Sequence, residues 1–332
     1  MKKFINNVDD VLIESLAGFA LAHQDLVTLH IEPNFVTRKQ PSLSKVAIIS
    51  GGGSGHEPLH TGYVGQGMLD AACPGYVFTS PSPDQILAAA TATHADKGVL
   101  FIVKNYAGDV MNFEVAAEML PFESATVLVS DDVAVENSTY TTGRRGVAGT
   151  VIVEKCVGAW AETGASLADC KILGDRVNAH TVTIGVALTS CTVPAAGKPT
   201  FELAENELEM GVGIHGEPGR ERQVLRRADE IVAEMMKALM IELTARNLTV
   251  DTNAQVLLLV NGFGGTTLME LYLLFNSAAK CLQTTGLKIE RSLVGNFTTA
   301  LEMAGASITL CLLDDEIKAL WDAPVNTPAL RW

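Results

Sequence analysis

Three side chains that can act as acids, bases or nucleophiles lie in glycine-containing segments directly after predicted strands. They are His56 in GGGSGHEP, Asp109 in KNYAGD and His215 in GVGIHGEPG. In open α/β sheets, ligands bind beyond the carboxyl ends of the strands, where glycine lets the backbone approach them closely. Because imidazole titrates near neutral pH, two histidines and a carboxylate there favour acid–base or nucleophilic chemistry.

Each of these residues also has an ordinary structural interpretation. A histidine in a loop is more often a surface or hydrogen-bonding residue than a catalyst. Asp109 is well suited to cap a helix that begins at Val110. Lys104, which follows an apolar strand, could simply be a solvated strand end.

Two other clusters are weaker candidates. His56, His60 and His215 could hold zinc, but Pro58 opposes a helix across 56–60 and no HExxH motif is present. His60 could instead support the site from behind His56. Arg144 and Arg145 in TTGRRG could clamp a phosphate, although a charged turn before a helix explains the pair slightly better.

The glycine-rich segments do not match common nucleotide-binding motifs. GGGSGHEP has no lysine and departs from the phosphate-binding loop GxxxxGK[ST]. The single GxGxxG match, at 211–216, is followed by Pro218 and Gly219 and lacks the expected strand–helix unit with its ribose-binding acid. We therefore expect neither a dinucleotide site nor ATP binding by a common route.

Alternating strands and helices must position these residues. The pattern favours an α/β fold with two α/β domains, 1–185 and 186–332, each a mixed sheet flanked by helices. Ser82, Pro83 and Gln85 predict a capped helix start. Predicted strands are 46–50, 76–80, 99–103, 126–130, 181–188, 255–260 and 307–313; predicted helices are 83–94, 110–118, 147–163, 166–179, 226–245, one from 267 and one over DDEIKALW.

Composition narrows the class of protein. The 332 residues are 48% hydrophobic, which is enough to build a large core, and they carry a net charge of −14. This acidity argues against binding to nucleic acids or anionic membranes. No apolar run reaches the length of a membrane helix. Six scattered cysteines without a CxxC motif are typical of a reducing cytoplasm.

Several motifs together resemble a known family. They are SGGGSGHEPLHTGYVGQGMLDAACPG, FTSPSPDQI, KNYAGDVMNFE, TTGRRGVAGT, CTVPAAGKP and MGVGIHGEPG. In this combination the chain resembles the dihydroxyacetone-binding subunits of dihydroxyacetone kinases, over essentially its whole length. The resemblance implies a two-domain α/β fold and a homodimer.

The resemblance also implies roles for individual residues. In this family the ketone is held as a covalent hemiaminal on the histidine of GIHGEPG, which is His215 here. His56 and Asp109 would handle the protons of transfer and carbinol formation, and which does which stays open. Further substrate contacts would come from Gly53, Ser54, Gly55, Ser80 and Lys104.

The phosphoryl group would come from elsewhere. ATP-dependent relatives carry a nucleotide-binding domain after this one, and we expect none before Trp332. The resemblance therefore implies a phosphotransferase-system enzyme, whose separate subunit carries ADP or ATP with magnesium and is recharged by a phosphocarrier. This chain would bind no cofactor or metal. Arg144 and Arg145 could lie near the contact with that subunit.

Two alternatives stay open. The family includes paralogues that bind dihydroxyacetone and act as coactivators of a transcription regulator without turnover. The intact set His215, His56 and Asp109 favours the enzyme, although a sensor could keep the same binding chemistry. A more remote alternative is an aldolase or isomerase acting on a carbonyl sugar.

Overall fold

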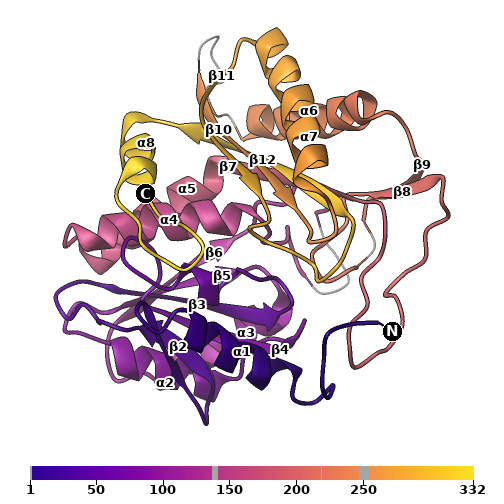
Figure 1. Cartoon of the computed structure of the whole chain (residues 1–332). Helices are drawn as coiled ribbons and strands as arrows, with labels where there is room; N and C mark the ends of the chain where they lie inside the picture. Colours follow the sequence, from indigo (N-terminus) through magenta and orange to yellow (C-terminus); the bar gives the residue numbers. More distant parts are fainter. Residues whose placement is uncertain (1, 137–140, 218, 247, 249–253) are drawn as a thin grey trace.

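The computed structural model describes the chain except residues 1, 137–140, 218, 247 and 249–253. Its elements form five stacked layers, in which two sheets alternate with three layers of helices (Figure 1). The α/β prediction with two mixed, helix-flanked sheets is confirmed. None of the helices among the described residues is long and apolar enough to cross a membrane.

The first sheet has the strand order β1-β2-β4-β3-β5-β6. β3 pairs in parallel with β4 and β5, and β5 in parallel with β6, whereas β1 and β2 form an antiparallel edge. The bounds are β1 Val27–His30, β2 Phe35–Arg38, β3 Ala47–Ser54, β4 Ala71–Val77, β5 Val99–Lys104 and β6 Ser124–Val129.

The second sheet has the order β11-β10-β12-β7-β8-β9. The β10–β11 pair is parallel, whereas β12, β7, β8 and β9 pair antiparallel to their neighbours. The bounds are β7 Thr181–Ala187, β8 Glu207–Met210, β9 Glu221–Val224, β10 Gln255–Gly262, β11 Lys288–Gly295 and β12 Gly305–Leu313. β7 thus spans residue 185, where we predict the domain boundary.

Helices cover both faces of both sheets. α2 (Pro83–Thr93) and α3 (Ala107–Met119) pack on the outer face of the first sheet, and α6 (Ala228–Ala245) and α7 (Leu268–Thr285) on that of the second. α4 (Gly149–Glu162) and α5 (Leu167–Ala179) lie between the sheets (Figure 1). The remaining helices are α1 Val11–Ala22, α8 Asp315–Asp322 and the 3-10 turn η1 Thr61–Tyr63.

The side chains along β3 and β5 point alternately to the two faces of the first sheet, which explains why helices cover both faces. Ile48 and Ile102 face the cluster that contains α4, whereas Ile49 and Phe101 face α2 and α3. Successive side chains of a strand point to opposite faces, so a strand covered on both sides is apolar throughout. β3 accordingly is buried along its entire length.

The capped helix start is confirmed, and two other predictions were wrong. Ser82 accepts a hydrogen bond from the Gln85 amide in a complete capping box, with Pro83 first in α2. The strand predicted at 76–80 lies earlier, at Ala71–Val77. Asp109 does not cap α3: the helix begins at Ala107, two residues before it, so Asp109 lies within the first turn.

Candidate active site

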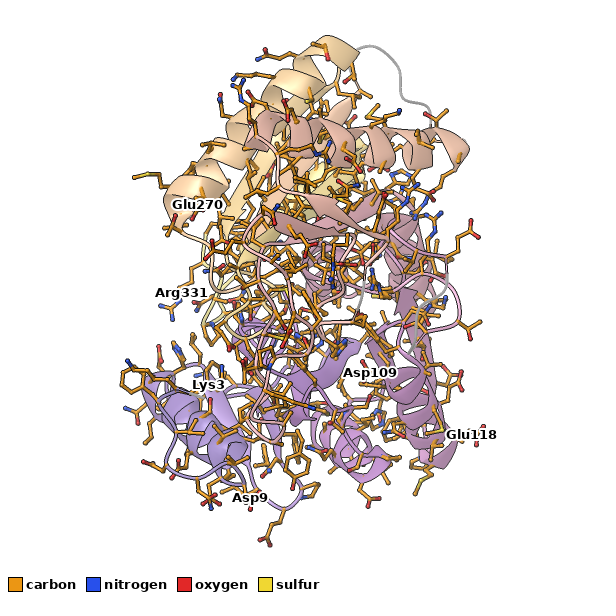
Figure 2. All side chains as sticks on the ribbon, turned by 90° about the vertical axis from the view of Figure 1, so that its right-hand side faces the viewer. Lys3, Asp9, Asp109, Glu118, Glu270 and Arg331 are labelled. Atoms are coloured by element: carbon orange, nitrogen blue, oxygen red, sulfur yellow. The ribbon has the colours of Figure 1, made fainter. Side chains whose placement is uncertain are left out.

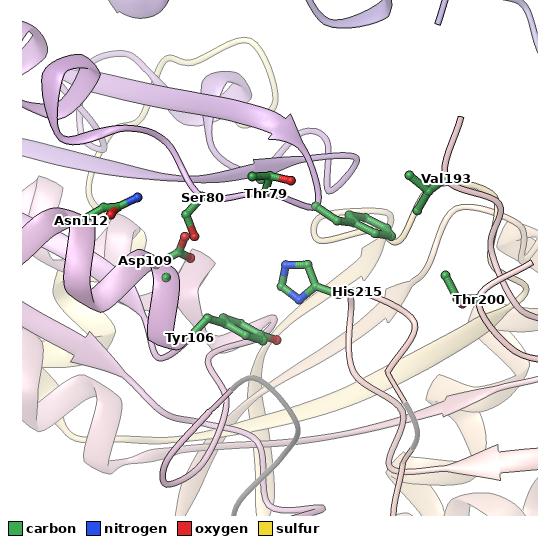
Figure 3. A pocket seen from close by; sticks show the side chains of 11 residues that line it. Thr79, Ser80, Tyr106, Asp109, Asn112, Val193, Thr200 and His215 are labelled. Carbon is green, nitrogen blue, oxygen red and sulfur yellow. The ribbon is translucent and has the colours of Figure 1, made fainter. Parts of the chain in front are cut away.

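A cavity of about 550 Å³ lies where loops from the two sheets meet. Figure 3 shows His215 pointing into it from the loop after β8, towards Ser80 and Asp109 of the first sheet's side. Figure 2 places Asp109 in the middle of the molecule, where the two halves adjoin. The lining residues are Gly53, Phe78, Thr79, Ser80, Tyr106, Gly108, Asp109, Asn112, Val193, Thr200 and His215.

Glu217 shapes the loop that carries His215. Its carboxylate accepts a hydrogen bond from the His215 amide at 2.9 Å and lies 4.0 Å from Nδ1 of the ring. A side chain at Gly213 would collide with this carboxylate, with an added Cβ only 1.9 Å from Oε1, so glycine is required there. Nδ1 is buried on the side of Glu217 without a hydrogen bond to it, so Nε2 is the ring nitrogen left to face the cavity.

The environment of the His215 ring keeps it neutral. Burial and the positive charges of Lys104 and Arg145 lower the pKa of His215 to about 3. Tyr106 contacts the ring edge-on with centroids 4.4 Å apart, and Phe78 does so at 5.4 Å. A neutral imidazole has a free lone pair, so His215 can act as a nucleophile at physiological pH.

His56 is a second neutral histidine, buried beside the cavity. Its Nδ1 donates to the carbonyl of Thr299 at 2.8 Å, which leaves the lone pair on Nε2. Within the described part of the chain, that Nε2 has no hydrogen-bond partner. Burial, His215 and Lys104 hold the pKa of His56 well below its usual value. His56 can therefore accept a hydrogen bond from a ligand hydroxyl.

Asp109 reaches the cavity from the first turn of α3, next to Ser80 (Figure 3). Gly108 makes this approach possible, because a Cβ there would lie 2.7 Å from the Ser80 Oγ. The nearest cation is Lys104, whose Nζ donates to the Asp109 Oδ2 at 3.5 Å. A buried carboxylate paired this loosely keeps lone pairs for a ligand proton.

Lys104 is not a solvated strand end. Its side chain is fully buried at the end of β5, with Nζ 2.9 Å from Nε2 of His60. Among the described residues it lies behind Asp109 rather than in the cavity lining. Sequence alone could not reveal this burial, since it depends on how α3 and the segment around His60 close over the strand end.

The structure gathers only part of the predicted site at the cavity. Gly53, Ser80, Asp109 and His215 line it, and His56 contacts the His215 ring at 4.7 Å between centroids. Ser54 instead donates to the Gly75 carbonyl, and the Gly55 amide donates to Glu57. The substrate contacts of Ser54, Gly55 and Lys104 stay predictions.

Sequence reasoning missed several lining residues. Three of them are Phe78 and Thr79 in the motif FTSPSPDQI and Tyr106 in the motif KNYAGD. Their place next to the predicted site residues Ser80 and Asp109 could have identified them. Asn112 follows Asp109 by three residues and therefore shares its helix face. Thr200, in the loop after CTVPAAGKP, carries no signal in the sequence.

The arginine pair does not form a surface clamp. Arg145 is fully buried and pairs with Asp132 at 2.5 Å and with Glu217 at 3.4 Å. Arg144 forms an ion pair with Glu242 and is partly exposed. Arg145 therefore cannot contact a partner at the surface; it supports the His215 loop through Glu217. Within the described ranges, no group of three His, Cys, Asp or Glu is placed to hold a metal ion.

Comparison with known proteins places this geometry in a family. A family model of the Dak1 domain matches residues 17–329. The dihydroxyacetone-binding subunit of the PEP-dependent dihydroxyacetone kinase of Escherichia coli (strain K12) is 51% identical over 355 residues, covering 100% of this chain and 99% of that protein.

Two solved structures share the fold. The dihydroxyacetone kinase operon co-activator Dha-DhaQ is 36% identical with a TM-score of 0.88, covering 95% of this chain and 96% of that one. The dihydroxyacetone kinase of C. freundii is 31% identical with a TM-score of 0.86, covering 98% of this chain and 60% of that one. These matches confirm the resemblance to dihydroxyacetone-binding subunits that the sequence predicts, and the chain belongs to the Dak1 domain family.

Proposed function

We propose that the chain is the dihydroxyacetone-binding subunit of a dihydroxyacetone kinase and holds its substrate covalently on His215. The observation that carries this is a neutral, cavity-facing His215 beside two further proton-handling groups, His56 and Asp109. Relatives at 46–51% identity are named as such subunits of PTS- or PEP-dependent kinases.

The first step is addition of His215 to the ketone. The Nε2 lone pair forms a bond to the carbonyl carbon, and the C=O π electrons move to oxygen, which gains a proton. Nδ1 gives up its proton in turn, so the hemiaminal carries no net charge. Glu217, 4.0 Å from Nδ1, can stabilise the transient positive charge on the ring. A polyol without a carbonyl, such as glycerol, cannot form this bond.

The second step is transfer of a phosphoryl group to a terminal hydroxyl. We assign Asp109 as the base that takes the hydroxyl proton when its oxygen attacks phosphorus, because Asp109 lines the cavity. We assign His56 to the carbinol hydroxyl, because its free Nε2 lies next to His215. Holding the ketone covalently fixes the attacking oxygen before transfer.

The phosphoryl donor is proposed to be ATP with magnesium on a separate subunit, recharged by a phosphocarrier of the phosphotransferase system. We also propose that the chain works as a homodimer in the cytoplasm, and its six free cysteines support a reducing compartment. Light scattering of the purified chain would give the mass of the assembly, and a monomer would contradict the dimer.

Turnover tests this function. A mixture of the chain, dihydroxyacetone, the nucleotide-binding subunit and a phosphoenolpyruvate-fed relay is expected to form dihydroxyacetone phosphate, measured by coupled reduction with NADH. Omission of the chain is the control, and His215→Asn is expected to abolish turnover. Equal rates with and without the chain would contradict the proposal.

One observation favours a second candidate function. The co-activator Dha-DhaQ shares the fold with a TM-score of 0.88, so a dihydroxyacetone sensor could use the same architecture. Ketone binding without turnover, in a mixture where an authentic kinase subunit is active, would support a sensor. The kinase is preferred because His56 and Asp109 accompany His215 at the cavity.

A further inference from the structure

Behind the cavity, four buried polar side chains form a continuous line into the middle helix layer. The Lys104 Nζ lies 3.5 Å from the Asp109 Oδ2 and 2.9 Å from the His60 Nε2. His60 Nδ1 lies 2.6 Å from the Oε1 of Glu154, which comes from α4. All four residues are at most 5% exposed. The proposed function uses Asp109, but neither His60 nor Glu154.

The chemistry of the groups fixes where the protons lie. An ammonium only donates, so the His60 Nε2 must accept from Lys104. The His60 proton is then on Nδ1, which donates to Glu154, with Ser50 Oγ a second acceptor at 3.0 Å. Ser50 gives its own proton to the Ile102 carbonyl at 2.6 Å. Glu154 thereby stabilises the tautomer in which the His60 Nε2 offers Lys104 a lone pair.

A glycine makes the central contact possible. A Cβ at position 52 would lie 2.2 Å from the Lys104 Nζ and 3.3 Å from the His60 Nε2. Glycine 52 of the GGGSGHEP segment therefore leaves room for Lys104 and His60, rather than for a ligand in the cavity. Contacts with His60 and Asp109, together with the space left by Gly52, therefore fix the position of the Lys104 ammonium.

Electrostatics agree with this arrangement. Burial raises the pKa of Glu154 to about 8 and holds the pKa of His60 well below its usual value, so this pair is neutral at pH 7. Asp109 is the other carboxyl group of the line, and it faces Lys104. His56 and Tyr63 are further titratable groups next to the line, and burial keeps both uncharged at neutral pH.

From this geometry we propose that His60 and Glu154 are positioning residues, which hold Lys104 back from Asp109 and so keep the Asp109 carboxylate available as a base. The role of Asp109 in this proposal rests on the proposed function. Without an acceptor at the His60 Nε2 position, the Lys104 ammonium turns its hydrogens to Asp109. A tighter ion pair weakens the base, so transfer slows while ketone binding at His215 persists.

Two substitutions at His60 separate this role from packing. In His60→Gln the amide oxygen can occupy the place of Nε2 and accept from Lys104. In His60→Asn the shorter side chain keeps only the Nδ1 end of the imidazole. His94→Asn is the matched control, since His94 stacks on Phe122 at 3.6 Å between ring centroids, away from the cavity.

The expected result is a split between kcat and KM. For His60→Asn, kcat falls about ten- to hundredfold, the effect of a lost hydrogen bond to a charged group, while KM for dihydroxyacetone changes less than about threefold. His60→Gln recovers most of kcat, and His94→Asn matches the parent chain. Equal losses in His60→Gln and His60→Asn, or an unchanged kcat in His60→Asn, would overturn the proposal.

A second readout does not depend on turnover. The ¹⁵N spectrum of the histidine side chains in the full chain is expected to show His60 protonated at Nδ1 and bare at Nε2. Glu154→Gln keeps an oxygen acceptor and this tautomer, whereas Glu154→Leu leaves the Nδ1 proton only the weaker acceptor Ser50 and is expected to lower the share of this tautomer. A proton on Nε2 in the parent chain would overturn the proposed contact. Absence of turnover in the parent chain, with the expected tautomer, would contradict only the kinase function and the role assigned to Asp109.

Discussion

The rings of His56 and His215 meet edge to face, with centroids 4.7 Å apart and planes inclined at 85°. They come from segments attached to different sheets, His56 after β3 and His215 after β8. Burial and the positive charge of Lys104 lower the pKa of both rings, so both histidines are neutral. The pair therefore offers one lone pair to a carbonyl carbon and another to the hydroxyl formed from that carbonyl.

Neutral buried histidines make stability depend on pH. The unfolded chain binds a proton at His215 below its ordinary pKa of about 6.5, whereas the folded chain does so only near pH 3. The free energy of unfolding therefore falls as the pH drops below 6.5, by up to about 1.4 kcal/mol per pH unit for this group.

Denaturant unfolding between pH 5 and 7 measures this slope. Glu154 acts in the opposite direction. Its pKa is raised to about 8 in the folded chain, so the stability that its protonated form contributes is lost as the pH rises towards 8. A comparison with His215→Asn isolates the histidine, and the variant is expected to show a smaller loss on acidification. The same slope in both proteins would argue against a depressed pKa at His215.

Asp109→Asn separates binding from transfer. The amide keeps the shape of the side chain but cannot take a proton, so we expect kcat to fall by about 10²- to 10⁴-fold. The covalent adduct on His215 should still form, which a ¹³C spectrum of labelled dihydroxyacetone would show. A variant with near-normal kcat would assign the base to another group, with His56 next in line.

Gly53 allows two backbone segments to approach at the edge of the cavity. A Cβ at this position would lie 2.6 Å from the Thr79 backbone nitrogen, which cannot move aside as a flexible side chain could. Gly53→Ala is expected to abolish ketone binding measured by calorimetry, and to lower the free energy of unfolding.

Gly18 provides the matched control for this substitution. It lies in α1 with nothing within 4 Å of an added Cβ. Gly18→Ala should leave binding intact and stabilise the helix by up to about 1 kcal/mol. Binding retained at the parent level in Gly53→Ala would show that the cavity edge tolerates displacement.

Substitution of Arg145 should destabilise the fold much more than substitution of Arg144. Arg145→Met leaves the buried carboxylates of Asp132 and Glu217 without their cation, and such losses cost about 3–5 kcal/mol. Arg144→Glu removes one partly exposed pair with Glu242, which is worth about 1 kcal/mol or less. Denaturant unfolding of both variants tests the difference, and comparable losses would contradict the buried role of Arg145.

The sequence predicted elements whose signals are local. The run VLFIV and the capping residues Ser82 and Gln85 specify β5 and the start of α2 through periodicity and hydrogen bonding close in the chain. β9 and β11, by contrast, carry several charged residues and lie at sheet edges, so their strand character comes from their neighbours.

The sequence likewise predicted those parts of the site whose signals are local. Glycine-rich settings after strands pointed to His56 and His215, and the structure brings both together. The burial of Lys104 and Arg145 could not be predicted, because long charged side chains are mostly exposed and only tertiary packing supplies their partners. For the same reason the line from Asp109 to Glu154 is visible only in the folded chain.

The central claim is that dihydroxyacetone is bound through a covalent bond to His215. The most direct test is a ¹³C spectrum of dihydroxyacetone labelled at its carbonyl carbon, mixed with the chain in slight excess. We predict that the ketone signal is replaced by that of a tetrahedral carbon bonded to nitrogen and oxygen, and that His215→Asn restores the free ketone signal. A bound ligand whose carbonyl carbon stays trigonal, or a tetrahedral signal that survives in His215→Asn, would contradict the account.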